Sequence, residues 1–180
     1  EWLERDGVLE RQLAYWREQL AGIPALLDLA TDYPRPAVRS AAGATLRFLI
    51  DAPLTAALRQ LAARRNDTLF MVLLAAVKVL LYRYTAEEDI CVGTAVANRR
   101  QAETEGLIGM FVNTLVLRAG VRPEASFHDL LAASRETFLA ALAHQDIPFE
   151  HVVDAVRPER DTSRTPLFQV MVAMHNLGAE

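Results

Sequence analysis

The polar residue that most needs an explanation in this sequence is Asn113, which stands inside the apolar run Met-Phe-Val-Asn-Thr-Leu-Val-Leu. An amide buried in such a run must find hydrogen-bond partners, or it costs about 1 to 3 kcal/mol. Its side chain could bind the backbone of a neighbouring loop, or it could contact a substrate directly. The residues alone favour the loop, and both interpretations stay open.

His144 is the second candidate, because an imidazole titrates near neutrality and Asp146 follows two residues later, which would suit a general base. The histidine stands at the end of a predicted helix, however, and there it more often caps the last carbonyl groups. Glu150, His151 and Asp154 share one predicted helix at metal-ligand spacing, but no second cluster accompanies them. We therefore expect no metal site.

Four arginines could pair with carboxylates: Arg99, Arg118, Arg160 and Arg164. Ion pairs that hold loops in place are the favoured interpretation for all of them. Arg99 keeps a special interest because it follows a buried strand, and ligands gather at the carboxyl ends of strands in α/β sheets. The sequence contains no nucleophile elbow, phosphate-binding glycine loop or dinucleotide fingerprint, so a self-contained hydrolase, kinase or dehydrogenase is not indicated.

These residues must be positioned by alternating helices and strands. Apolar periodicity and capping residues predict helices over residues 2–20, 51–66, 68–84, 127–143 and 148–156. The helix over 68–84 is apolar nearly all round, which favours burial between layers. Three prolines make residues 23–43 an extended connector.

Continuous apolar runs predict buried strands over residues 89–97 and 111–117, and shorter apolar stretches predict strands over 46–50 and 167–174. The polar residues 98–105 predict a loop. This alternation indicates an α/β fold with helices packed on a mixed β-sheet.

Composition limits the classes of function. The chain has 180 residues, of which 52% are hydrophobic and 23% charged, and a formal net charge of −4. One globular domain without a nucleic-acid surface is therefore expected. The longest apolar run, 69–77, is too short for a membrane span. A lone Cys91 in an apolar run predicts a buried thiol, and a cytoplasmic setting. Without an initial methionine, the chain is expected to be a piece of a longer one.

Four stretches in order resemble the condensation domains of nonribosomal peptide synthetases: Val-Gly-Thr at 92–94, Ile-Gly-Met-Phe-Val-Asn-Thr at 108–114, His-Gln-Asp-Ile-Pro-Phe-Glu at 144–150, and Arg-Asp-Thr-Ser-Arg-Thr-Pro-Leu-Phe-Gln at 160–169. Gln-Leu-Ala-Tyr-Trp at 12–16, Thr-Asp-Tyr-Pro-Arg-Pro at 31–36 and Tyr-Arg-Tyr-Thr at 82–85 resemble the same family. The resemblance thus spans nearly the whole chain.

The resemblance implies a fold similar to chloramphenicol acetyltransferase, with two lobes around a tunnel. Donor acyl or peptidyl groups and acceptor aminoacyl groups would arrive as phosphopantetheine thioesters on carrier domains, beside an adenylation domain. It implies that Arg99, Gly109, Phe111 and Asn113 lie near the substrate channel. It also implies motif residues with structural roles: Arg118, His144, Gln145, Asp146, Pro148, Phe149, Glu150, Arg160, Asp161, Ser163, Arg164 and Pro166.

The catalytic His-His-x-x-x-Asp-Gly motif of that family is absent from this sequence. We therefore interpret residues 1–180 as most of a C-terminal lobe without a catalytic residue of its own. Alone it is expected to be inactive, and its open apolar face could cause self-association. The alternatives are a non-catalytic module that docks carrier proteins and, with a poorer match, an epimerization domain.

Overall fold

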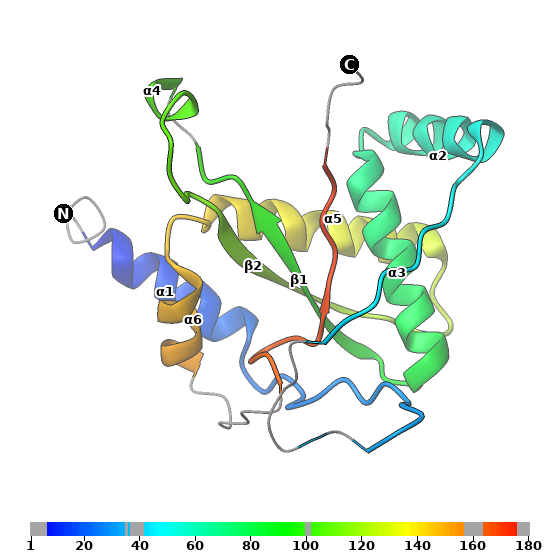
Figure 1. Ribbon diagram of the computed structural model, residues 1–180, viewed down its shortest axis with the longest axis horizontal. Helices are drawn as coiled ribbons and strands as arrows, with labels where there is room; N and C mark the ends of the chain where they lie inside the picture. Colours follow the sequence, from blue (N-terminus) through cyan, green and yellow to red (C-terminus); the bar gives the residue numbers. More distant parts are fainter. Residues whose placement is uncertain (1–6, 35, 37–41, 100–101, 157–163, 176–180) are drawn as a thin grey trace.

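The computed structural model describes residues 7–34, 36, 42–99, 102–156 and 164–175. Its elements are α1 (Val8–Gln19), α2 (Ala52–Arg65), α3 (Leu69–Thr85), β1 (Asp89–Val96), α4 (Ala102–Glu105), β2 (Asn113–Gly120), α5 (Phe127–Ala143), α6 (Phe149–Val156) and β3 (Val170–Met171). The described strands form one sheet in the order β2-β1-β3, and helices lie on both of its faces (Figure 1).

Local signals explain where the long helices begin. Asp51 caps α2 by accepting a hydrogen bond from the amide of Leu54, while Thr68 and Ser126 cap α3 and α5 in the same way. Such caps satisfy amide groups that have no partner inside the helix. The helices predicted from periodicity are confirmed where the structure describes them. Residues 2–6 of the first predicted helix lie outside the described residues, and α1 follows Gly7, whose φ of 67° suits glycine.

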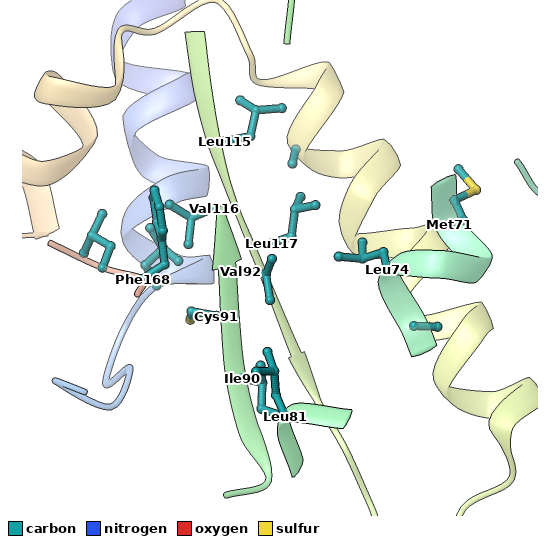
Figure 2. Close-up of a cluster of buried hydrophobic side chains, with 14 of the residues drawn as sticks. Met71, Leu74, Leu81, Ile90, Cys91, Val92, Leu115, Val116, Leu117 and Phe168 are labelled. Atoms are coloured by element: carbon teal, nitrogen blue, oxygen red, sulfur yellow. The ribbon is translucent and has the colours of Figure 1, made fainter. Parts of the chain in front are cut away.

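The sheet is mixed, as predicted. β1 pairs antiparallel with β2 over its whole length, from Asp89 opposite Gly120 to Val96 opposite Asn113, and it pairs parallel with β3. Both faces of β1 are buried because helices cover them. Val92 and Leu117 lie on the side of α3 and α5, whereas Val116 and Phe168 lie on the side of α1 (Figure 2).

One strand prediction was wrong and another was too long. Residues 46–50 are extended but pair with no described strand, and all of 42–50 is exposed. The strand predicted over 167–174 is reduced to Val170–Met171, because Leu167 has a left-handed φ of 68° that turns the chain just before it. Strand formation needs a partner, and the apolar stretch at 46–50 contains no information about one.

Smaller corrections concern three other elements. The predicted loop over 98–105 contains the short helix α4, and the strand predicted from Phe111 begins at Asn113 and continues to Gly120. Helix α3 is not buried all round, since Leu80 and Tyr84 on it are 54% and 71% exposed. Cys91 is a buried free thiol, as expected, and burial raises its pKa to about 12.

No single helix in the described part of the chain is long and apolar enough to cross a membrane. Helices α2 and α3 pass such a test only together, as a pair bent by 107°.

Candidate functional site

Asn113, the first residue of β2, is hydrogen-bonded through every polar atom of its side chain. Its Nδ2 donates to the carbonyl oxygens of Gln145 at 2.8 Å and Ile147 at 2.7 Å. Its Oδ1 accepts from the amides of Phe149 at 3.1 Å and Thr114 at 2.9 Å. These contacts match the interpretation in which Asn113 binds the backbone of a neighbouring loop. The amide has no donor left for another partner.

The loop that Asn113 binds is also held from helix α1. Gln12 donates through Nε2 to Asp146 Oδ2 at 2.9 Å and accepts through Oε1 from the amide of Ile147 at 3.3 Å. Trp16 donates through Nε1 to the carbonyl oxygen of His144 at 3.0 Å. We call this loop, residues 144–149, with its bound side chains from α1 and β2, the junction. It connects α1, β2, α5 and α6.

His144 caps helix α5. Its Nδ1 lies 2.8 Å from the carbonyl oxygen of Ala140, and Gln145 donates through Nε2 to the carbonyl oxygen of Leu142 at 2.8 Å. The imidazole also stacks on the ring of Tyr15, with centroids 3.9 Å apart and planes 7° apart. Burial raises the pKa of Tyr15 to about 12. These are the contacts of a helix-terminal histidine, and they tie the ring to its own helix.

Pro148 and Phe149 continue from the junction into α6. The carbonyl oxygen of Pro148 accepts from the amides of His151 at 3.0 Å and Val152 at 3.4 Å, which begins the helix. The ring of Phe149 packs against Phe168, with centroids 5.7 Å apart. Glu150 is exposed in the first turn, where a negative charge is favourable to the helix dipole.

Arg99 organises the connection between β1 and β2, residues 97–112, which projects away from the helices together with α4 (Figure 1). Its guanidinium donates to the carbonyl oxygens of Thr104, Leu107 at 2.9 Å and Gly109 at 3.3 Å. It also lies 4.2 Å from the centroid of the Phe111 ring, a cation–π distance. Thus the structure brings together Arg99, Gly109 and Phe111.

The same connection carries large apolar side chains that are exposed. Its exposed large residues are Leu107 at 54%, Ile108 at 106%, Met110 at 94% and Val112 at 60%. A row of apolar side chains on a projecting segment marks an interaction surface more often than chance exposure does.

Arg118 fastens the end of α1 to the sheet. It forms a bidentate pair with Asp89, at 2.9 Å and 2.7 Å, on the neighbouring strand. Its Nη1 donates to the carbonyl oxygens of Gln19 at 3.0 Å and Ala21 at 2.8 Å. The hydrogen bond to Asp89 raises the pKa of Arg118. A cation on the last carbonyls of a helix is also favourable to its dipole.

The last motif is only partly described, because Arg160, Asp161 and Ser163 lie outside the described residues. Arg164 is half-buried and Pro166 is exposed. Phe168 packs so closely on Gly93 that a Cβ there would lie 2.4 Å from its ring, so β1 requires glycine at this position.

Within the described residues, no group of three or more His, Cys, Asp and Glu could hold a metal ion. His128, His151 and His175 are exposed. The sequence analysis assigned no role to Gln12 or Trp16, although the segment that contains them carries part of the resemblance. Their partners are 134 and 128 residues away, a separation that leaves no signal in local pattern.

The sequence matches the condensation-domain family over residues 2–180, and the chain belongs to that family. It is similar to one of the subunits of linear gramicidin synthase from Brevibacillus parabrevis, with 54% identity over 177 residues, which are 98% of this chain and 4% of that protein. It is also 49% identical to phosphinothricin tripeptide synthetase PhsC of Streptomyces viridochromogenes over 91% of this chain and 15% of that one.

Solved structures of related proteins have the same fold. The four-domain nonribosomal peptide synthetase holo-AB3403, bound to AMP and glycine, matches with a TM-score of 0.92 and 31% identity over 97% of this chain and 13% of that chain. The X-domain from teicoplanin biosynthesis matches with a TM-score of 0.87 and 29% identity over 93% of this chain and 37% of that chain. The fold is therefore that of the chloramphenicol acetyltransferase-like condensation domains. The chain spans only a small part of its curated relatives.

Proposed function

We propose that this chain is most of the C-terminal lobe of a condensation domain that joins two thioester-bound substrates through a peptide bond. The acceptor amine would attack the donor thioester carbon, the carbon–sulfur bond would break, and the proton lost by the amine would end on the donor arm's sulfur, which leaves as a free thiol. Both substrates would be carried on phosphopantetheine arms of carrier domains. The observation that carries the proposal is the match to the family over residues 2–180.

In this proposal the chain supplies one wall of the channel rather than the catalytic histidine. Arg99, Gly109 and Phe111 form one rigid group at the end of β1. Asn113 acts as a positioning residue that holds the junction against β2, since all its polar atoms are bound there. The contacts support a shaped wall, and the chemistry would come from the N-terminal lobe.

The proposal names four kinds of partner: the N-terminal lobe, the donor carrier, the acceptor carrier and the adjacent adenylation domain. All would act in the cytoplasm. The exposed side chains of Ile108 and Met110 support a surface that another lobe covers. In the isolated chain the same surface would favour self-association.

A second candidate function is a non-catalytic module that docks other proteins. One observation favours it: the X-domain of teicoplanin biosynthesis, with 28% identity and a TM-score of 0.88, is solved in a complex with OxyB. This fold therefore accommodates a protein partner on its surface. The two functions differ in whether the parent protein forms product.

Reconstitution tests the proposal. The complete condensation domain, with carrier domains loaded with donor and acceptor thioesters, should form the dipeptidyl product, and the isolated chain should form none. Product from the isolated chain would contradict the partial-lobe assignment. Binding of loaded carriers by the complete domain without any product would instead support the docking function.

Self-association is tested with Ile108→Ser combined with Met110→Ser. Removing two apolar side chains from the projecting connection should shift the isolated chain toward monomer in analytical ultracentrifugation. Leu80→Ser, an exposed apolar position on α3, is the matched control and should leave the distribution unchanged. A monomeric isolated chain before any substitution would contradict this part of the proposal.

A further inference from the structure

A hollow lies on the opposite side of β1 from Phe168, at the strand's carboxyl end. The first turn of α3, the last residues of β1, Phe138 of α5 and Met174 after β3 enclose a pocket of about 410 Å³. Ligand pockets in proteins are typically about 300 to 1,000 Å³. This volume therefore suits a small organic group.

The walls of the pocket are apolar. Phe70 and Phe138 contact each other with ring centroids 4.9 Å apart, and Leu69, Val96 and Met174 complete the lining. None of the lining residues is charged. Because a charged group without a partner is expensive to bury, the pocket selects for an apolar occupant.

Two polar residues, Thr68 and Thr94, interrupt this apolar surface. The Thr68 hydroxyl caps α3 by accepting from the amide of Met71, and Thr94 is 2% exposed. A threonine hydroxyl at the wall of a pocket can donate to or accept from a polar group of an occupant. A carbonyl or amide of the occupant could fill this role.

The pocket adjoins the proposed channel wall. Val96, which lines the pocket, lies directly opposite Asn113 in the sheet, and paired residues of antiparallel strands point to the same face. Arg99 follows three residues after Val96 and holds Gly109 and Phe111. The pocket therefore lies on the same face and at the same end of the sheet as Asn113.

We propose that this pocket binds the apolar side chain of one of the two thioester-bound substrates, with Thr94 Oγ1 bonded to a carbonyl or amide of the same substrate. The inference rests on the proposed condensation activity and adds a determinant of substrate choice to it. Loss or gain of a methylene in such a pocket changes selectivity by about 10- to 200-fold. The pocket would thus rank substrates by side-chain size.

The experiment uses the complete condensation domain and N-acetylcysteamine thioesters of alanine, valine, leucine, phenylalanine and glutamate. In one arm the donor varies and the acceptor is fixed, and in the other arm the acceptor varies. Phe138→Ala should change the ranking of kcat/KM among apolar side chains in one arm by about tenfold. That arm identifies whether the pocket serves donor or acceptor. Leu139→Ala, an exposed neighbour on α5, is the control and should leave both rankings unchanged.

Thr94 supplies an independent test. Thr94→Val keeps the shape but removes the hydroxyl, so KM should rise about fivefold in the same arm. The melting temperature of the free domain should not fall, because in this inference the hydroxyl binds substrate and does not hold the fold. Thr94→Ser should restore KM. A lower melting temperature with unchanged KM would make the hydroxyl structural and overturn the inference.

Failure of the inference and failure of the proposed function are distinguishable. Product formation with rankings unaffected by Phe138→Ala in both arms overturns the pocket inference alone. Absence of product with every substrate pair contradicts the condensation activity. In that case the pocket inference is tested by binding alone. The leucine thioester should raise the melting temperature of the domain, Phe138→Ala should abolish this shift, and Leu139→Ala should leave it unchanged. A shift equal in both variants overturns the inference.

Discussion

Asn113 and Lys78 are both buried polar residues of this lobe, but their surroundings are opposite. Asn113 is 8% exposed, and its side chain makes three hydrogen bonds with residues 144–149 and one with the amide of Thr114. Lys78, in the middle of α3, is fully buried, and its Nζ has no hydrogen-bond partner within the described residues. Asn113 is thus a buried polar group that fixes how neighbouring segments pack, whereas the desolvation cost of burying Lys78 is not offset by any hydrogen bond within the described residues.

The chemistry of the two groups explains the difference. A neutral amide can satisfy backbone donors and acceptors at the same time, so it joins loops at little electrostatic cost. An ammonium group has only donors, and burial penalises its charge. Burial accordingly lowers the pKa of Lys78 to about 8 from its ordinary 10.5, while Cys91 nearby opposes this shift. Lys78 on α3 therefore lowers the stability of the folded protein, whereas the junction raises it.

The largest expected effect is that of Asn113→Ala. The substitution leaves two carbonyl oxygens and an amide of the junction without partners, which should lower the free energy of unfolding by about 3 kcal/mol. Urea denaturation of the complete domain measures this loss. Gln60→Ala, which removes an exposed amide on α2, is the control and should change stability by less than about 0.5 kcal/mol. Reduced turnover with unchanged stability would assign Asn113 to substrate contact instead.

Asn113 also shows how much of the site could be predicted from the sequence. An amide inside an apolar run predicts a need for partners, and this part of the interpretation required no structure. The partners themselves, at positions 145, 147 and 149, could not be predicted because they lie 32 to 36 residues away. Helices α2, α3 and α5 were predictable because their periodicity and caps are local. Strand pairing is non-local, so the strand predicted over 46–50 was wrong and the one predicted over 167–174 was too long.

Substitution of Lys78 should have an effect of opposite sign. Lys78→Met keeps the apolar stem and removes the buried charge, so the free energy of unfolding at pH 7 should rise by about 2 kcal/mol. Arg83→Gln, which removes an exposed cation from the same helix, is the control. A loss of stability in Lys78→Met would show that the ammonium has a partner in the folded protein, and the contrast with Asn113 would disappear.

The pH dependence sharpens this test. Because the folded pKa of Lys78 lies below its unfolded value, the unfolded chain binds more protons between pH 8 and 10.5. The cost of the buried charge is complete below pH 8 and disappears as pH rises through this window. The advantage of Lys78→Met should therefore shrink from pH 8 to 10.5. Cys91, whose pKa burial raises to about 12, lowers stability above pH 9 in both proteins, and Lys78 opposes that shift. The difference between the two proteins therefore isolates Lys78 between pH 8 and 9, below the range in which Cys91 titrates.

The smallest expected effect concerns the other end of the junction. Trp16→Phe keeps an aromatic ring in the core but removes the donor to the carbonyl oxygen of His144, so the free energy of unfolding should fall by about 1 kcal/mol. Amide hydrogen exchange should accelerate across residues 144–149 more than in β1, because the lost bond holds this loop to α1. Equal acceleration in both segments would mean that the junction has no stability of its own. Its many hydrogen bonds would then contribute only to the global fold, and the distinction between the junction and the Lys78 site would be one of charge alone.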